Sequence, residues 1–203
     1  MKVKWRLYPI FLITFSVFLT QCGYTLRRSG SPVLEEMGIK TVYIRPIQNQ
    51  TLVTGAENMM YNALVRRISA QKFVRLTDNK AQADAVIVGE ISEANYTPSQ
   101  STTADLIEPA GEALNTTRIV ATHYRAVLNV SIGLYRYSPK RGISDSPLVT
   151  NQFRRSQQFI ANNYIGVLGT TSAILNESGF RRSLDDLVDE IATDFNESML
   201  GFF

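Results

Sequence analysis

The thiol of Cys22 is the side chain in this sequence best placed to do chemistry, and it is the only cysteine among 203 residues. It follows a basic start and an apolar run from Leu7 to Leu19, which is the plan of a secretory signal. A thiol that emerges at a membrane face is a nucleophile and can take a diacylglycerol group. Because each buried methylene contributes about 0.8 kcal/mol, several acyl chains hold a protein at a bilayer almost permanently. We therefore expect lipid attachment at Cys22.

The four residues that end at this cysteine, Leu19-Thr20-Gln21-Cys22, resemble the bacterial lipobox, in which the cysteine becomes the first residue of the mature protein. Gln21 departs from the small residue that usually precedes the cysteine. The pattern predicts a lipoprotein signal peptide over residues 1–21. It also predicts a lipidated N-terminus and tether over residues 22–38.

An uncleaved membrane anchor is the alternative to cleavage. It is disfavoured because a transmembrane helix needs about 20 apolar residues and this run is shorter. Gly23 stands where lipoproteins retained at the inner membrane often carry Asp. We therefore expect a protein of a Gram-negative cell, anchored by lipid to the periplasmic side of the outer membrane.

Charged side chains are the second candidate chemistry, and they are unevenly distributed. Three of the 21 basic residues lie before Cys22, and the remaining 18 balance 18 acidic residues, which argues against nucleic acid as a partner. Residues 118–182 hold nine basic and two acidic residues, whereas residues 183–203 hold six acidic and no basic ones. Either the two segments neutralise each other or stay solvated, or the basic one holds an anionic ligand, since Arg and Lys suit phosphate. The candidates for that ligand are Lys140, Arg141, Arg154 and Arg155.

Catalytic and metal-binding motifs are missing from the sequence. It contains no phosphate loop, no nucleophile elbow and no zinc-protease helix motif. The single histidine, His123, and the single cysteine leave no cluster of soft ligands for a structural zinc. We therefore expect no enzymatic activity, no metal and no cofactor. A group of carboxylates lies off the apolar stripe of the last helix and is expected to be solvated: Asp185, Asp186, Asp189 and Glu190.

One strand and one helix are expected early in the mature chain. β-Branched and aromatic residues predict a strand over residues 39–47, with Pro46 at its end or at a sheet edge because proline cannot donate to a ladder. Thr54 and Glu57 have the spacing of a capping box. A helix of about four turns is predicted to follow, because apolar residues recur there at helical spacing. Its buried face is formed by Met60, Leu64 and Ile68.

Strands dominate the middle of the chain. Apolar residues at every second position from Tyr124 to Leu134 predict the clearest of them. Residues 97–118 lack periodicity and are expected to form a long connection, either functional or disordered. Turn-forming residues 138–147 join the clearest strand to a more polar one that carries Val149, Phe153 and Phe159 on one face. The other strands expected here are residues 72–77, 83–96 and 148–160.

The chain is expected to end in a helix. Asn176 is a suitable N-cap, and the apolar stripe that follows has helical spacing. Two helices against four strands predict a two-layer α+β fold, with two helices packed on a four-stranded, mainly antiparallel sheet. We expect one such domain over residues 39–203. The stripe consists of Phe180, Leu184, Leu187, Val188, Ile191 and Phe195.

Three stretches of the chain resemble the LptE family of lipopolysaccharide-assembly lipoproteins. They are C-G-Y-T-L from Cys22, I-K-T-V-Y-I-R-P-I-Q-N-Q-T from Ile39 and A-D-A-V-I-V-G-E-I from Ala83. The resemblance extends over nearly all of the mature chain and includes the long central strand and the terminal helix. The third stretch also resembles other envelope lipoproteins. The departures from the family are Gln21 and the polar residues 97–118.

The resemblance implies an outer-membrane lipoprotein that is seated inside the β-barrel LptD. There it would help the barrel to fold, act as a plug and bind lipopolysaccharide on its way to the cell surface. An alternative is another envelope lipoprotein, either an activator of a peptidoglycan synthase or a subunit of a secretion pore. Such proteins usually carry a long disordered tether after the cysteine, which is missing here. A periplasmic enzyme is the last alternative.

Overall fold

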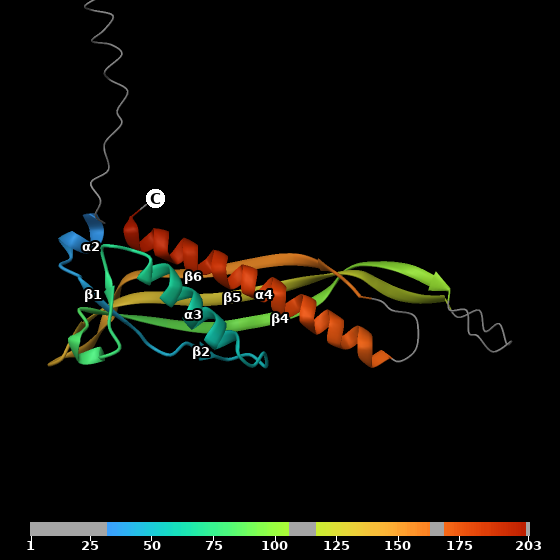
Figure 1. Cartoon of the computed structure of the whole chain (residues 1–203), viewed down its shortest axis with the longest axis horizontal. Helices are drawn as coiled ribbons and strands as arrows, with labels where there is room; N and C mark the ends of the chain where they lie inside the picture. Colours follow the sequence, from blue (N-terminus) through green and yellow to red (C-terminus); the bar gives the residue numbers. More distant parts are fainter. Residues whose placement is uncertain (1–31, 106–116, 163–168, 202–203) are drawn as a thin grey trace, which may run out of the picture. The chain divides into compact units, whose positions relative to one another are not determined.

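The computed structural model describes residues 32–105, 117–162 and 169–201 of the chain. They form one six-stranded sheet in the order β3-β1-β4-β5-β6, with β2 paired to β4 beside β1. Helices α3 and α4 lie side by side on one face of this sheet (Figure 1). The three long strands are β4 (Ala85–Asp105), β5 (Thr117–Ser138) and β6 (Gly142–Ile160), and they form an antiparallel meander.

The remaining elements are short, apart from the two long helices. The short strands are β1 (Thr41–Ile44), β2 (Gln48–Asn49) and β3 (Arg75–Leu76). β1 pairs in parallel with β3 and β4, and β2 pairs in parallel with β4. A 3₁₀ turn, η1 (Lys80–Gln82), precedes β4. The α-helices are α2 (Pro32–Glu36), α3 (Ala56–Ser69) and α4 (Gly169–Leu200).

The α+β fold is confirmed, but the expected count of four strands and two helices is wrong. The additional elements are β2 and β3, with two residues each, and α2, with five. Elements this short are below the window in which hydrophobic periodicity can be recognised. Within the segment predicted as a tether, α2 places Leu34 in the core with 2% of its surface exposed.

Pro46 lies between β1 and β2, two short strands that pair one after the other with β4. β1 pairs with the start of β4, and the chain returns to the same edge at β2 after Pro46. The backbone N–H of Arg45 donates to Ile87 O at 3.0 Å, so the ladder is nearly continuous up to the proline. The next side chain, Ile47, packs on Gly89, where an added Cβ would lie 2.7 Å from Ile47 Cδ1. A larger residue at position 89 would force the end of the Ile47 side chain to shift.

The long connection expected over residues 97–118 is wrong. β4 continues to Asp105 and β5 begins at Thr117, and only residues 106–116 between them lie outside the described residues. Register shifts near Ile91 and Pro98 let β4 bend without losing its pairing to β5. Threonine suits a strand, but polar residues on both faces produce no hydrophobic alternation. The pattern therefore could not reveal this half of the hairpin.

The turn between β5 and β6 is also shorter than expected. Ser138 pairs with Gly142, and Arg141 N donates to Ser138 O at 3.1 Å. Gly142 has φ = 79°, a left-handed conformation that favours glycine at this turn. β6 therefore starts at Gly142 instead of residue 148. The shared face of this strand is confirmed, since its three apolar residues all belong to the core or pack against it: Val149, Phe153 and Phe159.

The start of each helix differs from the expectation, whereas the buried faces agree. The N-cap of α3 is Gly55 with φ = 92°, not Thr54, and no side chain caps the helix. Only half of the expected capping box exists, because Glu57 Oε1 accepts from Gly55 N at 3.3 Å. The predicted buried face of α3 is confirmed: Met60, Leu64 and Ile68 are at most 1% exposed.

α4 begins at Gly169, so Asn176 lies inside the helix and is not its N-cap. The side chain of Asn176 is buried, and its Oδ1 accepts from Asn162 N at 2.7 Å. This hydrogen bond ties the helix to the segment that leaves β6. An asparagine side chain can accept a hydrogen bond from a backbone N–H either as an N-cap or, as here, from inside a helix. The residue type alone does not separate these two roles, which explains the wrong expectation. The predicted stripe is confirmed, with every member buried: Phe180, Leu184, Leu187, Val188, Ile191 and Phe195.

Candidate functional site

The four candidate cations lie at two separate places on the hairpin of β5 and β6. Lys140 and Arg141 are exposed in the turn between the strands. Arg154 and Arg155 follow further along β6, and at about 3.3 Å per residue they lie roughly 40 Å of strand away from that turn. The structure therefore does not gather the four at one site.

Arg154 lies on the sheet face that points away from α3 and α4. It is in register with Asn129, and its guanidinium group is 3.3 Å from Glu93 Oε2 on β4. Glu93 Oε1 also accepts from Asn95 Nδ2 at 3.2 Å. The Arg154 side chain is 67% exposed. Such an exposed pair contributes little stability, so the guanidinium group can exchange Glu93 for another anion at low cost.

Arg155 points to the opposite face and binds α4. Its Nη2 lies 2.5 Å from Asp194 Oδ2, and its Nε lies 2.9 Å from Glu190 Oε1. The hydrogen bond with Asp194 raises the pKa of Arg155. Arg155 therefore joins the sheet-edge strand β6 to the closing helix. At this residue the basic and acidic segments neutralise each other by packing.

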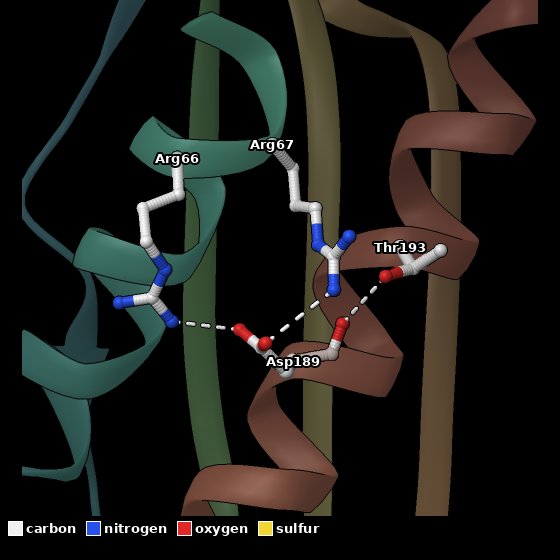
Figure 2. A network of polar contacts seen from close by, with 4 residues as sticks. All are labelled: Arg66, Arg67, Asp189 and Thr193. Carbon is white, nitrogen blue, oxygen red and sulfur yellow. Dashed lines mark hydrogen bonds and ion pairs between the residues drawn. The ribbon is translucent and has the colours of Figure 1, made fainter. Parts of the chain in front are cut away.

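A second ion-pair group joins the two helices to each other (Figure 2). Arg66 Nη2 and Arg67 Nη2 of α3 lie 2.7 Å and 3.4 Å from the two carboxylate oxygens of Asp189 on α4. Thr193 Oγ1 donates to Asp189 O at 2.7 Å, one turn further along α4. Gln71, just beyond the end of α3, donates to Asn196 on α4 and extends the same seam.

Three of the four carboxylates expected to be solvated are exposed, whereas Asp189 is half-buried, and most of the four also bind a named partner. Asp189 and Glu190 bind arginines, and Asp186 accepts from Gln157 Nε2 at 3.2 Å. The sequence gives no signal for these partners, because Arg66 and Asp189 are 123 positions apart. Helical spacing shows which side of α4 is polar, but the neighbouring element is set by the fold.

The Ala-Asp pair of the third family-like stretch has a structural role. Asp84 Oδ2 accepts from Lys40 N at 2.9 Å, from Thr41 N at 2.8 Å and from Thr41 Oγ1 at 2.8 Å. Burial acts to raise the pKa of Asp84, but these hydrogen bonds outweigh it and the pKa is lowered. Asp84 therefore fixes the start of β1 against the start of β4.

The loop from Asn49 to Gly55 is held by side-chain hydrogen bonds. Asn49 Oδ1 accepts from Thr51 N at 2.9 Å and from Thr51 Oγ1 at 2.7 Å. Asn49 Nδ2 donates to Val53 O at 2.9 Å and to Glu57 Oε2 at 2.7 Å. Hydrogen bonds from its own backbone N–H, from Asn49 and from Gly55 lower the pKa of Glu57. These hydrogen bonds hold the loop in one defined conformation.

His123 is half-buried near the end of the β5–β6 pairing, and its Nδ1 lies 3.3 Å from Thr122 Oγ1. Within residues 32–105, 117–162 and 169–201, no three His, Cys, Asp or Glu side chains are arranged to hold a metal ion. No helix in these same ranges is long and apolar enough to cross a membrane. Cys22 lies outside the described residues.

These observations define an α+β domain in which two helices cover one face of a sheet and charged side chains join the helices to the strands. The chain belongs to the LptE family, described as lipopolysaccharide-assembly, whose family model matches residues 39–199. This is a family of non-enzymatic lipoproteins of the cell envelope, so the chain is an assembly protein and not an enzyme. The comparison with curated proteins found no match.

Several solved structures are similar to the chain at low sequence identity. The protein CT253 from Chlamydia trachomatis is 12% identical, with a TM-score of 0.47, over 79% of this chain and 98% of that one. The uncharacterized lipoprotein B from Nitrosomonas europaea is 17% identical, with a TM-score of 0.39, over 86% and 91%. The rare lipoprotein B from Shewanella oneidensis is 9% identical, with a TM-score of 0.39, over 80% and 96%. Likeness at this level carries no functional argument.

Proposed function

We propose that this chain is an outer-membrane lipoprotein that works with the β-barrel LptD to assemble lipopolysaccharide at the cell surface. In this proposal it is the plug and assembly factor of the barrel and a lipopolysaccharide-binding component. The family match over residues 39–199 carries the proposal. It also favours lipopolysaccharide assembly over a peptidoglycan-synthase activator or a secretion-pore subunit.

The structure adds a physical argument for a barrel partner. On the face that points away from α3 and α4, the middle of the sheet carries polar side chains in neighbouring strands. The interior of an outer-membrane barrel is polar as well. A sheet face of this kind can lie against such a wall because its polar groups can exchange hydrogen bonds with water for hydrogen bonds with the wall. The side chains that illustrate it are Asn95, Arg125, Asn129, Gln152, Arg154 and Gln158.

The proposal includes cleavage after residue 21, lipid attachment at Cys22, a tether to residue 38 whose α2 packs on the domain, and one domain over residues 39–203. Mass spectrometry of the mature N-terminus tests the first two parts, since it should find a triacylated Cys22. A free thiol at Cys22 or an uncleaved Met1 would contradict them. The tether and the domain boundary are tested by limited proteolysis of the lipoprotein in detergent, which should remove the N-terminal segment and leave a folded core.

The tagged protein, purified from detergent-solubilised outer membrane, tests the partner. LptD should be recovered with it in a fixed ratio. Depletion of the protein from cells should also reduce lipopolysaccharide at the surface. Recovery of a peptidoglycan synthase or of a secretion pore instead of LptD would replace the proposal by one of its alternatives.

A further inference from the structure

The segment expected to be a plain tether contains the helix α2, which is docked on the domain. Leu34 of α2 is 2% exposed, and Ile39, shortly after the helix, is 3% exposed. α2 packs on α4 and lies beside its C-terminal end (Figure 1). Helices shorter than about 12 residues are marginal on their own in water. The five residues of α2 are therefore helical because they are held against the domain.

The end of α2 is closed by two backbone hydrogen bonds. Ile39 N donates to Leu34 O at 2.9 Å, and Gly38 N donates to Glu35 O at 3.0 Å. Gly38 has φ = 67°, in the left-handed region that this kind of helix end requires. Both apolar members of the arrangement, Leu34 and Ile39, belong to the hydrophobic core. The chain is therefore fixed to the domain from Leu34 onwards.

Two further contacts place α2 at one end of the long strands. Arg136 Nη2 of β5 donates to Met37 O at 2.7 Å, and Asp84 Oδ2 accepts from Lys40 N at 2.9 Å. Arg136 is in register with the first residue of β4. From that residue β4 runs to Asp105, which at about 3.3 Å per residue is roughly 65 Å of strand. The far end of β4 is thus distant from α2.

The chain between Cys22 and Leu34 limits how far the docked helix can lie from a lipid on that cysteine. Residues 23–33 separate the two, and a chain spans at most about 3.6 Å per residue, which gives about 40 Å. If α2 were not docked, the next fixed residue would be Lys40, and the limit would be about 60 Å. Docking of α2 thus shortens the maximum reach by about a third.

We infer that docking of α2 shortens the link between lipid and domain to residues 23–33 and so holds the α2 end of the domain near the membrane. The inference rests on the proposed function, which supplies the lipid on Cys22. The link, at most about 40 Å long, is shorter than the roughly 65 Å of β4. The α2 end therefore stays close to the bilayer, and the far end of β4 is directed away from it.

The test is energy transfer from a fluorophore on the full-length mature lipoprotein to acceptor lipids in vesicles of phosphatidylethanolamine and phosphatidylglycerol. Cys22 is the only cysteine and is acylated in the proposed function, so an added cysteine is labelled alone. Asp78→Cys puts the label near the α2 end, since Thr77 N donates to Val42 O at 3.0 Å. Thr102→Cys puts it towards the far end of β4. Transfer should be about twice as efficient from position 78 as from position 102.

Three variants lengthen the link by different routes. Leu34→Asp should undock α2, because a buried carboxylate without a partner is unfavourable. Gly38→Val should undock it without adding a charge, because valine is strained at this φ. A Gly-Ser insertion of about ten residues between Gly30 and Ser31 lengthens the link with α2 still docked. Each should reduce transfer from position 78 to about half. Glu36→Ala, at an exposed position of α2, is the matched control and should leave transfer unchanged.

The outcomes separate this inference from the proposed function. Equal transfer from positions 78 and 102 in the parent chain overturns the inference, because neither end is then held at the membrane. A loss with the insertion but not with Leu34→Asp or Gly38→Val also overturns it, since α2 then does not limit the reach. Urea denaturation checks that the variants stay folded. A mature chain without lipid on Cys22, which does not bind the vesicles, contradicts the proposed function itself.

Discussion

Gly179 of α4 lies directly against the ring of Phe159 of β6, so that a Cβ added to the glycine would be 2.9 Å from Phe159 Cδ2. The ring cannot easily move away, because it stacks on Tyr124 at 5.6 Å and contacts Tyr96 at 5.8 Å between ring centroids. Tyr96 in turn packs on Phe180 at 4.8 Å. Gly179 weakens the helix locally, and its place is explained by this close approach of the helix to the sheet.

The first prediction concerns this contact. Gly179→Ala should lower the free energy of unfolding by about 1 kcal/mol, because overpacking costs about 1–3 kcal/mol and the gain in helix propensity returns about 1 kcal/mol. Urea denaturation measures the change. Phe159→Leu combined with Gly179→Ala should lose less than the two single changes together. Stabilisation by Gly179→Ala alone would show that the helix does not pack as closely as described.

The second prediction separates two neighbouring arginines on β6. Arg155→Ala should destabilise the domain by about 1–2 kcal/mol, because it leaves Asp194 and Glu190 without their cation where the helix meets the strand. Arg154→Ala is the matched control, and it should cost at most about 0.5 kcal/mol, since its pair with Glu93 is exposed. Urea denaturation of both variants gives the comparison. Equal losses would mean that the two faces of β6 are equivalent.

The third prediction concerns acid stability. The pKa values of Asp84 and Glu57 are lowered from ordinary values of 3.8 and 4.5. A carboxyl whose pKa is lower in the folded chain contributes stability that is complete above its unfolded pKa and is lost as pH falls through the folded value. The free energy of unfolding should therefore decrease as the pH is lowered below about 4.5.

Asp84→Asn should lower stability at neutral pH and make the loss on acidification shallower. Asp78→Asn, at an exposed position close by in sequence, is the matched control and should change neither. Urea denaturation between pH 3 and pH 7 provides the readout. A steeper acid dependence in Asp84→Asn would reverse the sign and contradict the account.

The fourth prediction treats the ligand candidates as two groups, because the structure separates them. Lys140→Ala with Arg141→Ala removes the turn cations, and Arg154→Ala removes one cation of the sheet face that α3 and α4 do not cover. If these cations bind lipopolysaccharide phosphate, each variant should weaken binding at low salt and reduce its salt dependence. Arg155 is tested by stability first, since its guanidinium group is held by α4. Unchanged binding when all four are alanine would remove the candidates.

The sequence predicted the parts of the fold in which one face is apolar. Leu128 and its alternating neighbours on β5, and Leu184 with its stripe on α4, are fully buried as expected. The pattern failed where both faces of an element are polar. β4 beyond Tyr96 is a strand whose residues resemble those of a loop, and the first turns of α4 lie before its apolar stripe begins.

The candidate site was predicted less well, for a different reason. Charge counting found the basic hairpin and the acidic helix, but not which side chains meet. Arg155 and Arg154 are adjacent in sequence and face opposite ways because side chains alternate along a strand. Asp189 is bound by arginines of a helix far away in sequence. Contacts of this kind follow from tertiary packing.

The end of the β4–β5 pair next to residues 106–116 is a two-stranded ribbon. Residues 102–105 and 117–120 pair with each other, and no third strand is paired with them in the described part of the chain. Two-stranded ribbons are marginally stable in water. Their amide hydrogens should therefore exchange with deuterium first, while those of β5 near Leu128, between two strands and beneath α4, exchange last.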